Sequence, residues 1–396
     1  MFENVQTAPP DAILGLTEAF KADTNPDKIN LSVGVYQDAD GKTPIFEVVK
    51  AAEKKRVEEE SSKAYMPMTG DPAYGKLVQQ LMLGEDHPII GAGRACTAHC
   101  PGGTGALRVA GDYLHKLHSS AKIWLSDPTW ANHGGIFAAA GMESAQYAYR
   151  DPKTNGLDFG AMIGSLKKIP AGDVVLLHGC CHNPTGIDPT PEQWSEIGDV
   201  IKAGGVLPLV DFAYQGLADG LEEDPSGLRK LCEKVDELIV SSSFSKNFGL
   251  YRERTGAITM VGADAEQTAR VLSQLKLVIR TNYSNPPAHG AVIVVNVLSN
   301  PSLKAAWEKE VAVMRDRING MRRLLVDTLK AKGVSQDFSF IPKQRGMFSF
   351  SGLTAEQVDQ LREKYSIYIV RSGRINVAGM NEKNMDRLCE AIKSVL

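Results

Sequence analysis

Cysteine is scarce in this sequence, and so are long apolar runs and any large excess of one charge. Six cysteines in 396 residues are too few for a disulfide-stabilised scaffold, and no apolar run is long enough to span a bilayer. A net charge of −3 does not favour nucleic acid or an anionic membrane as a partner. The first residues lack the basic and apolar regions of a signal peptide. The sequence therefore predicts a cytoplasmic protein with reduced thiols.

Apolar runs and helical stretches alternate through the middle of the chain. With 43% hydrophobic and 23% charged residues, the composition is that of an ordinary globular protein, and the length suggests roughly two or three domains. The alternation is typical of βαβ units, so it predicts an α/β fold with a mostly parallel sheet. The predicted strands are residues 121–126, 173–177, 206–210, 237–240 and 256–260.

The two ends of the chain follow other patterns. Near the start, the sequence predicts a short helix capped by Asp11 and a strand over residues 28–36. Apolar residues from Leu303 to Leu329 recur every three or four positions and predict one long amphipathic helix that ends at Gly333. The remainder mixes short strands with helices and predicts a smaller α+β unit. Its predicted strands are residues 346–350 and 368–371.

One polar stretch directly follows an apolar run that predicts a buried strand. Four serines, Ser241, Ser242, Ser243 and Ser245, surround Lys246. A lysine on a tight, partly desolvated turn is neutral part of the time, and a neutral amine attacks carbonyl carbons to form a Schiff base. The alternative is a solvated lysine on an exposed, serine-rich loop.

A glycine-rich turn over residues 102–105 opens a predicted helix. Backbone N–H groups at the start of a helix bind anions, and Thr104 adds a hydroxyl group. A phosphate site is one interpretation of this turn. An ordinary tight turn is the other, because the glycine spacing matches neither the P-loop nor G-x-G-x-x-G.

Asp211 and Tyr214 follow the predicted strand 206–210. Ligands in open α/β sheets bind beyond the carboxyl ends of strands. There a carboxylate can pair with a protonated ring nitrogen, and a phenol can donate to a ring oxygen. The alternative for Asp211 is a helix N-cap. Trp130 and His133 follow another predicted strand, where the indole stacks on a ligand ring or simply packs in a loop.

Cys180, Cys181 and His182 form a cluster that suggests a metal site. Vicinal cysteines beside a histidine lack the ligand spacing of zinc sites, so we predict no metal here. Asn183 precedes Pro184 and is therefore held extended, which can direct its amide toward a pocket.

Taken together, these residues resemble the class I, fold-type I aminotransferases that use pyridoxal 5′-phosphate, and among them the bacterial aspartate and aromatic aminotransferases. The resemblance covers essentially the whole chain. It is carried most specifically by residues 180–188, 211–216, 243–246 and 282–287. It implies a large domain with a mostly parallel, seven-stranded sheet flanked by helices, and a smaller α+β domain.

The resemblance also implies domain boundaries and an assembly. The large cofactor-binding domain would cover residues 47–320, and the small domain would combine residues 15–46 with 321–396 after an N-terminal arm of residues 1–14. The protein would be a homodimer with composite active sites, to which each chain lends groups from its neighbour.

For the cofactor, the resemblance implies a role for each polar residue described above. Lys246 would carry pyridoxal 5′-phosphate as a Schiff base and later move protons. Asp211, supported by His133, would keep the ring nitrogen protonated. Tyr214 and Asn183 would bind the phenolic ring oxygen. The phosphate would be held by Gly103, Thr104, Ser243, Ser245 and Arg254, and by Tyr65 of the neighbouring subunit.

For the substrate, the resemblance implies two arginines at opposite ends of a small amino acid. Arg374 would bind the α-carboxylate, and Arg280 of the neighbouring subunit would bind a distal carboxylate, because guanidinium groups bind carboxylates bidentately. Trp130 would also stack on the cofactor ring. The residues predicted to contact substrate are Gly34, Trp130, Asn183, Arg280 and Arg374.

Two carboxylate-binding arginines favour an aspartate aminotransferase, which transfers the amino group of L-aspartate to 2-oxoglutarate and yields oxaloacetate and L-glutamate. Four positions depart from the pattern expected of that type. Ala64, Gln37, Ala131 and Thr255 stand where asparagine, lysine, proline and valine are expected. Aromatic amino acids, tyrosine and phenylalanine, therefore stay open as substrates.

Two other classes of protein compete with this interpretation. A nucleotide-binding dehydrogenase would use the glycine-rich turn, but the glycine spacing argues against it. A binding protein that retains the fold without catalysis is the other class, and the presence of Lys246, Asp211 and Arg374 argues against it.

Overall fold

Two compact units make up the chain in the computed structural model, which describes residues 1–7 and 14–396. The larger unit comprises Pro44–Asp316 and Gln344–Gly346; the smaller comprises Met1–Thr43, Arg317–Lys343 and Met347–Leu396. The tripeptide Gln344–Gly346 thus belongs to the larger unit, although the chain on either side of it belongs to the smaller one. Over the described residues, we find no helix with the length and apolar character needed to cross a membrane.

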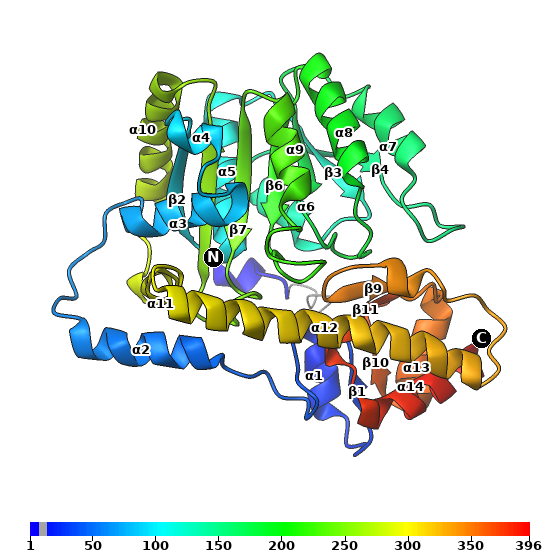
Figure 1. The fold of residues 1–396 in the computed structure, drawn as a ribbon. Helices are drawn as coiled ribbons and strands as arrows, with labels where there is room; N and C mark the ends of the chain where they lie inside the picture. Colours follow the sequence, from blue (N-terminus) through cyan, green and yellow to red (C-terminus); the bar gives the residue numbers. More distant parts are fainter. Residues whose placement is uncertain (8–13) are drawn as a thin grey trace. The chain divides into compact units, whose positions relative to one another are not determined.

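A seven-stranded sheet forms the centre of the larger unit (Figure 1). Its strands are β2 (Ala95–Pro101), β3 (Ile123–Asp127), β4 (Ser144–Ala148), β5 (Val174–His178), β6 (Leu207–Phe212), β7 (Leu238–Ser243) and β8 (Thr255–Val261). Their order across the sheet is β2-β8-β7-β6-β5-β3-β4. Neighbours from β7 to β4 run parallel, whereas β8 is antiparallel to both β7 and β2. The predicted α/β fold with a mostly parallel sheet is confirmed.

Helices cover both faces of this sheet. The helices of the larger unit are α2 (Glu47–Glu59), α3 (Pro72–Leu83), α4 (Pro88–Gly91), α5 (Gly102–Leu117), α6 (Asn132–Ala139), α7 (Phe159–Leu166), α8 (Pro191–Gly204), α9 (Ser226–Lys234), α10 (Ala265–Asn282) and α11 (Ala288–Leu298). Figure 1 shows α3, α8 and α9 in front of the sheet and α5 and α6 behind it. Leu107, Phe137 and Ile279, from α5, α6 and α10, are fully buried in one core cluster with the strands. Each such side chain stabilises the fold by about 1.5–3 kcal/mol through burial.

Two strands of the sheet have no counterpart among the predicted ones. β2 reads Ala-Cys-Thr-Ala-His-Cys-Pro and β4 reads Ser-Ala-Gln-Tyr-Ala, so neither is a continuous apolar run. Both lie at edges of the sheet. Edge strands are less buried than central ones, so their sequences carry a weaker apolar signal.

The long helix predicted near residue 303 is confirmed as α12 (Pro301–Ala331). Its residues up to Asp316 belong to the larger unit, and those from Arg317 onward belong to the smaller one. Trp307, near its start, is fully buried.

The smaller unit contains two pairs of short strands. β1 (Ile29–Asn30) pairs in parallel with β10 (Ile367–Tyr368), and β9 (Phe348–Phe350) pairs antiparallel with β11 (Arg374–Asn376). Its helices are α1 (Leu14–Ala22), α13 (Ala355–Tyr365) and α14 (Glu382–Val395), and the short 3₁₀ segments of the chain are η1 (Phe2–Asn4), η2 (Ile341–Lys343) and η3 (Val377–Gly379). The mixed α+β character is as predicted, whereas the predicted cap Asp11 lies outside the described residues.

The predicted strand over residues 28–36 is wrong in its length, because only Ile29–Asn30 form a strand. The side-chain oxygen of Asn30 accepts hydrogen bonds from the N–H and the hydroxyl of Ser32, at 3.0 and 2.7 Å. This local turn competes with the strand ladder and ends it.

Candidate active site

β5, β6 and β7 bring polar side chains together where these strands finish. We call this end of the sheet the carboxyl edge. In the parallel register His178 lies opposite Asp211, and Asp211 lies opposite Ser241. Asp211 belongs to β6 itself, so the alternative of a helix N-cap is wrong. This edge is the place at which open α/β sheets bind ligands.

Lys246 lies in the turn that follows β7. The N–H of Gly249 donates to its carbonyl oxygen at 3.1 Å, and its side-chain nitrogen lies 4.6 Å from the centre of the Tyr214 ring. Burial lowers the pKa of Lys246 to about 8; the charge of Asp211 opposes this shift and that of Arg254 adds to it. A larger share of this amine is therefore neutral than in an exposed lysine, as a nucleophile requires.

A hydrogen-bonded chain leads away from Asp211. Nε2 of His133 lies 3.1 Å from Oδ2 of Asp211, and Nδ1 of the same ring lies 2.8 Å from the hydroxyl of Thr129. That hydroxyl lies 3.3 Å from Nε2 of His178. Nδ1 of His178 accepts a hydrogen bond from the backbone N–H of Asn183 at 3.3 Å. The carboxylate of Asp211 is thus connected to the backbone that carries Asn183.

The surroundings of Asp211 keep its carboxylate ionised. Only 11% of its side chain is exposed, and burial by itself raises the pKa of a carboxyl group. The hydrogen bond from His133 and the charges of His133 and Lys246 outweigh that effect, so the pKa of Asp211 is lowered below its ordinary value. A buried carboxylate that stays charged is suited to bind a protonated ring nitrogen.

Sequence reasoning missed Thr129 and His178, which lie in this chain. His178 is the last residue of β5, so the strand-end signal that pointed to Asp211 applies to it as well. Burial, together with the charge of His133, lowers the pKa of His178 to about 3. The His182 ring lies 4.1 Å from the His178 ring and stacks at 3.9 Å on Tyr149. His178 is therefore a neutral link in the chain.

Asp188 holds the loop that carries Asn183 through two hydrogen bonds. The Asp188 carboxylate accepts hydrogen bonds from the N–H groups of Cys181 and His182, at 2.7 and 2.9 Å. Burial raises the pKa of Asp188 to about 6. Asn183 itself is buried. Trp130 follows the next strand along the sheet, and its ring lies 5.2 Å from that of His133, so the structure brings Trp130, His133, Asp211 and the Asn183 loop together.

The start of α5 has the properties of an anion site. No side chain of the described residues caps this helix, so the N–H groups of its first turn, at Gly102, Gly103 and Thr104, lack a side-chain capping acceptor. Gly102 has φ of +72°, and a Cβ added there would lie 2.4 Å from Nη2 of Arg254. A Cβ added at Gly103 would lie 3.2 Å from that of Ser243. Glycine therefore permits the close approach of these groups.

Hydroxyl groups and one guanidinium face this helix start. Ser243 donates to Ser245 at 3.1 Å, and Nη1 of Arg254 donates to Ser245 at 3.4 Å. Within residues 1–7 and 14–396 no carboxylate forms an ion pair with Arg254. Free helix N–H groups, hydroxyls and an arginine without a carboxylate fit the phosphate of pyridoxal 5′-phosphate, with Lys246 and Asp211 beside them for its ring.

The smaller unit holds the two remaining substrate residues of this chain together. Arg374, in β11, is buried; it donates to the carbonyl oxygen of Ser32 at 2.7 Å, and its guanidinium lies 4.3 Å from the Phe348 ring. A Cβ added at Gly34 would lie 3.2 Å from the same ring. Sequence reasoning missed Phe348, because nothing in the chain marks it apart from other apolar residues.

Tyr65 and Arg280 are not brought to Lys246 within one chain. Tyr65 is 92% exposed. Arg280, in the last turn of α10, is also exposed and donates to the hydroxyl of Ser284. Both residues are accessible to a second chain.

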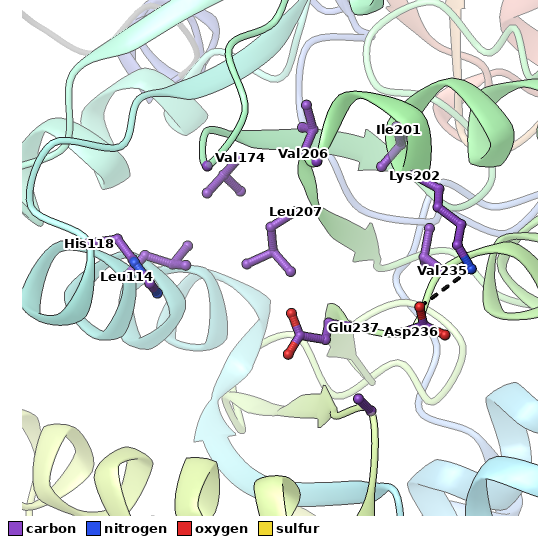
Figure 2. Close-up of a pocket in the computed structure, with 13 residues that line it drawn as sticks. Leu114, His118, Val174, Ile201, Lys202, Val206, Leu207, Val235, Asp236 and Glu237 are labelled. Carbon is purple, nitrogen blue, oxygen red and sulfur yellow. Dashed lines mark ion pairs between the residues drawn. The ribbon is translucent and has the colours of Figure 1, made fainter.

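A hollow of about 490 Å³ lies at the other end of β5, β6 and β7, where these strands begin (Figure 2). Val174 and Leu207, at the starts of β5 and β6, line it, and Lys202 forms an ion pair with Asp236 at 3.4 Å. None of the predicted site residues lines this hollow, so it is separate from the edge that carries Asp211.

Cys180 and Cys181 precede the Asn183 loop in the chain, and all six cysteines are buried and form no disulfide. The ligand atoms of Cys180, Cys181 and Asp224 lie within 4.8 Å of one another. The Asp224 carboxylate already accepts hydrogen bonds from four backbone N–H groups, and burial raises the pKa of the Cys180 thiol. A neutral thiol is a poor metal ligand, so no metal is expected here.

Replacing Cys180 and Cys181 together with alanine should lower the free energy of unfolding by about 1–3 kcal/mol and leave turnover nearly unchanged, because these buried thiols fill space in the core. Chemical unfolding and steady-state kinetics measure the two effects. Zinc bound in stoichiometric amount, and lost together with activity on chelation, would contradict this expectation.

The geometry above agrees with what the chain is similar to. The profile of the family "Aminotransferase class I and II" matches residues 26–392. An aspartate aminotransferase of Escherichia coli is 56% identical over the full length of both chains. An aromatic-amino-acid aminotransferase of Pseudomonas aeruginosa is 46% identical over 100% of this chain and 98% of its own.

A solved structure shares the fold throughout. The aromatic-amino-acid aminotransferase of Burkholderia pseudomallei, covalently bound to pyridoxal phosphate, superimposes with a TM-score of 0.98. It is 51% identical and covers 100% of this chain and 99% of its own. The chain therefore belongs to the class I and II aminotransferases, and it is a pyridoxal-phosphate-dependent enzyme.

Proposed function

We propose that the enzyme transfers the amino group of L-aspartate to 2-oxoglutarate and yields oxaloacetate and L-glutamate. The observation that carries this proposal is the 56% identity, over the whole length, to a relative named aspartate aminotransferase. Arginine residues at positions 280 and 374 are consistent with it, because they suit a substrate with two carboxylates.

Aromatic amino acids are the second candidate donors. The Burkholderia pseudomallei structure is that of an aromatic-amino-acid aminotransferase and is 51% identical to this chain. The departures at Gln37, Ala64, Ala131 and Thr255 leave room for this activity. An enzyme of dual specificity would combine both.

A kcat/KM panel with aspartate, glutamate, tyrosine and phenylalanine as donors tests the proposal. The expected result is that aspartate exceeds tyrosine and phenylalanine by at least about tenfold, since a bidentate arginine–carboxylate pair is among the stronger charge-assisted contacts. A higher kcat/KM for tyrosine than for aspartate would replace the proposal with the aromatic alternative.

For the cofactor, we assign the polar edge of the larger unit. Bound there, pyridoxal 5′-phosphate supplies an electron sink. Lys246 is the attachment point and moves the proton at the substrate α-carbon, while Asp211, positioned by His133, holds the proton on the ring nitrogen. Tyr214 and Asn183 bind the phenolic oxygen. Trp130 stacks on the ring, and the phosphate is held by Gly103, Thr104, Ser243, Ser245 and Arg254.

For the substrate, we assign Arg374 and Gly34 of one chain to the α-carboxylate end. Arg280 of a second chain would bind the distal carboxylate, and Tyr65 of that chain would reach the phosphate. The exposure of both residues in a single chain supports this arrangement. The protein would thus be a homodimer with composite sites.

The predicted domain division and cytoplasmic location belong to the same proposal. The large domain would cover residues 47–320, and the small domain residues 15–46 and 321–396. The chain passes from one compact unit to the other after Thr43 and after Asp316, which supports boundaries close to these.

Mixed dimers test the assignment of Arg280. One chain carries Lys246→Ala and the other carries Arg280→Asp, and each homodimer should be nearly inactive toward aspartate. In a mixed dimer one site collects both defects and the other is intact. Random reassortment makes about half of the dimers mixed, so refolding the two proteins together should restore roughly a quarter of wild-type activity.

Differently tagged chains confirm that mixed dimers have formed. If confirmed mixed dimers recover no activity, Arg280 acts within its own subunit, and the assignment of the distal carboxylate to the neighbour fails.

A further inference from the structure

The residue after Lys246 links two loops of the proposed site. The side-chain amide of Asn247 donates a hydrogen bond to the carbonyl oxygen of Gln215 at 3.2 Å. Gln215 directly follows Tyr214, so a single side chain joins the turn that carries Lys246 to the loop that carries Tyr214. Asn247 is 2% exposed, so water does not compete for this bond.

The Gln215 end of this link is itself fixed. The side-chain amide of Gln215 donates to the carbonyl oxygens of Leu81 and Leu221, both at 2.8 Å. The next N–H along the chain, that of Gly216, donates to the buried Asp224 carboxylate at 2.7 Å. The Tyr214 loop is therefore a rigid support.

The Asn247 end is fixed by α12. Nε1 of Trp307 donates to the backbone carbonyl oxygen of Asn247 at 2.7 Å, and the ring of Trp307 stacks on that of Phe248 at 4.6 Å and 28°. The turn therefore has little freedom to move relative to Tyr214. Lys246 has a long, flexible side chain, so the place of its amine depends on how well its backbone is held.

The residue type at position 247 is not the one that packing alone would favour. Oδ1 of Asn247 is buried and accepts no hydrogen bond from any described residue. A buried polar atom without a partner destabilises the fold, and leucine would fill a similar volume without that cost. The amide is explained if its donor group is needed for its link to Gln215.

We propose that Asn247 is a positioning residue that fixes the Lys246 amine against the Tyr214 phenol, and this inference rests on the proposed function. The amine lies 4.6 Å from the centre of the Tyr214 ring. A phenol that donates to the ring oxygen of the bound cofactor favours the neutral form of the Lys246–cofactor linkage. If the link is lost, that donation weakens and the linkage becomes more basic.

The test is a spectrophotometric pH titration of the holoenzyme, which reports the pKa of the Lys246–cofactor linkage without reference to turnover. Asn247→Leu should raise this pKa by roughly 0.5–1, the effect of weakening one neutral hydrogen bond. Tyr214→Phe should raise it at least as much. In the Tyr214→Phe background, Asn247→Leu should add little, because both changes remove the same interaction.

Val297→Ala is the matched control, because Val297 is fully buried in α11 and forms no hydrogen bond with these groups among the described residues. It should lower Tm and leave the pKa of the linkage unchanged. If Asn247→Leu does not fold, Asn247→Ala removes the amide without adding a charge and should shift the pKa in the same direction.

Two outcomes overturn the inference: an unchanged pKa in a folded Asn247 variant, or a shift that adds fully to that of Tyr214→Phe. Borohydride reduction and peptide mapping separate this from a failure of the proposed function. If the label lies on Lys246 in wild type and variant, the proposed attachment holds whatever the titration shows; if wild type carries the label elsewhere, the proposed function itself fails.

Discussion

Replacing Lys246 with alanine should lower turnover by at least about 10²–10⁴-fold, the contribution of a positioned general acid–base group. In the proposed function the amine both attaches the cofactor and moves a proton, and among the described residues no other lysine belongs to this polar group. The variant should still bind cofactor without a covalent bond, because the start of α5, the serines and Arg254 remain. Borohydride reduction of the wild-type enzyme should fix the cofactor to the peptide that contains Lys246.

Stability of the cofactor-free protein gives a second readout for Lys246. With a pKa of about 8 in place of the ordinary 10.5, the charged amine destabilises the fold by about 3 kcal/mol, to order of magnitude. This cost is present below pH 8 and fades between about pH 8 and 10.5, because only the unfolded chain still binds the proton there. Lys246→Met should therefore be more stable than wild type at pH 7, and the difference should vanish toward pH 10.5.

Control variants separate these effects from general damage. Lys246→Arg keeps a positive charge but cannot attach the cofactor, so it should be inactive and should not gain stability at pH 7. A label on another peptide, or near-normal turnover in Lys246→Ala, would contradict the assignment.

Replacing Asp211 with alanine should lower kcat by roughly 10²–10³-fold, as when one fixed electrostatic partner is removed from an active site. The carboxylate is held ionised by His133, and in the proposed function it would retain a proton on the ring nitrogen. KM for the amino donor should change little, because Asp211 is assigned to the cofactor and not to the substrate. Cofactor retention should weaken.

Two matched variants define which property of Asp211 matters. Asp211→Asn keeps the shape and removes the charge, so it should resemble Asp211→Ala in kcat. Asp211→Glu keeps the charge and displaces it, so it should be milder. A kcat for Asp211→Asn close to that of wild type would show that the charge is not required.

The sequence located Asp211 within one residue of the predicted strand and the start of a helix at Gly102, because apolar runs predict buried strands and polar groups lie near their ends. His178 carried the same strand-end signal and was overlooked, whereas Thr129 was missed because its importance comes from a loop that folds back beside His178. Pairings between separate segments leave no mark in either segment alone.

The errors have the same origin. The strand predicted over residues 28–36 stops after two residues, because Asn30 turns the chain locally and the strand paired with it, β10, is equally short. β2 and β4 lack a continuous apolar run because each has a neighbour on only one side. Local propensity gives way to tertiary context in each case.

The hydrogen bond between Arg374 and Ser32 in the smaller unit has a consequence for synthesis. The two residues are 342 residues apart in the chain. At roughly 5–20 residues per second, a ribosome needs on the order of 20–70 s to make the intervening segment. Ser32 therefore leaves the ribosome long before Arg374 exists, and the arginine proposed to bind the α-carboxylate meets this support only after nearly the whole polypeptide has been made.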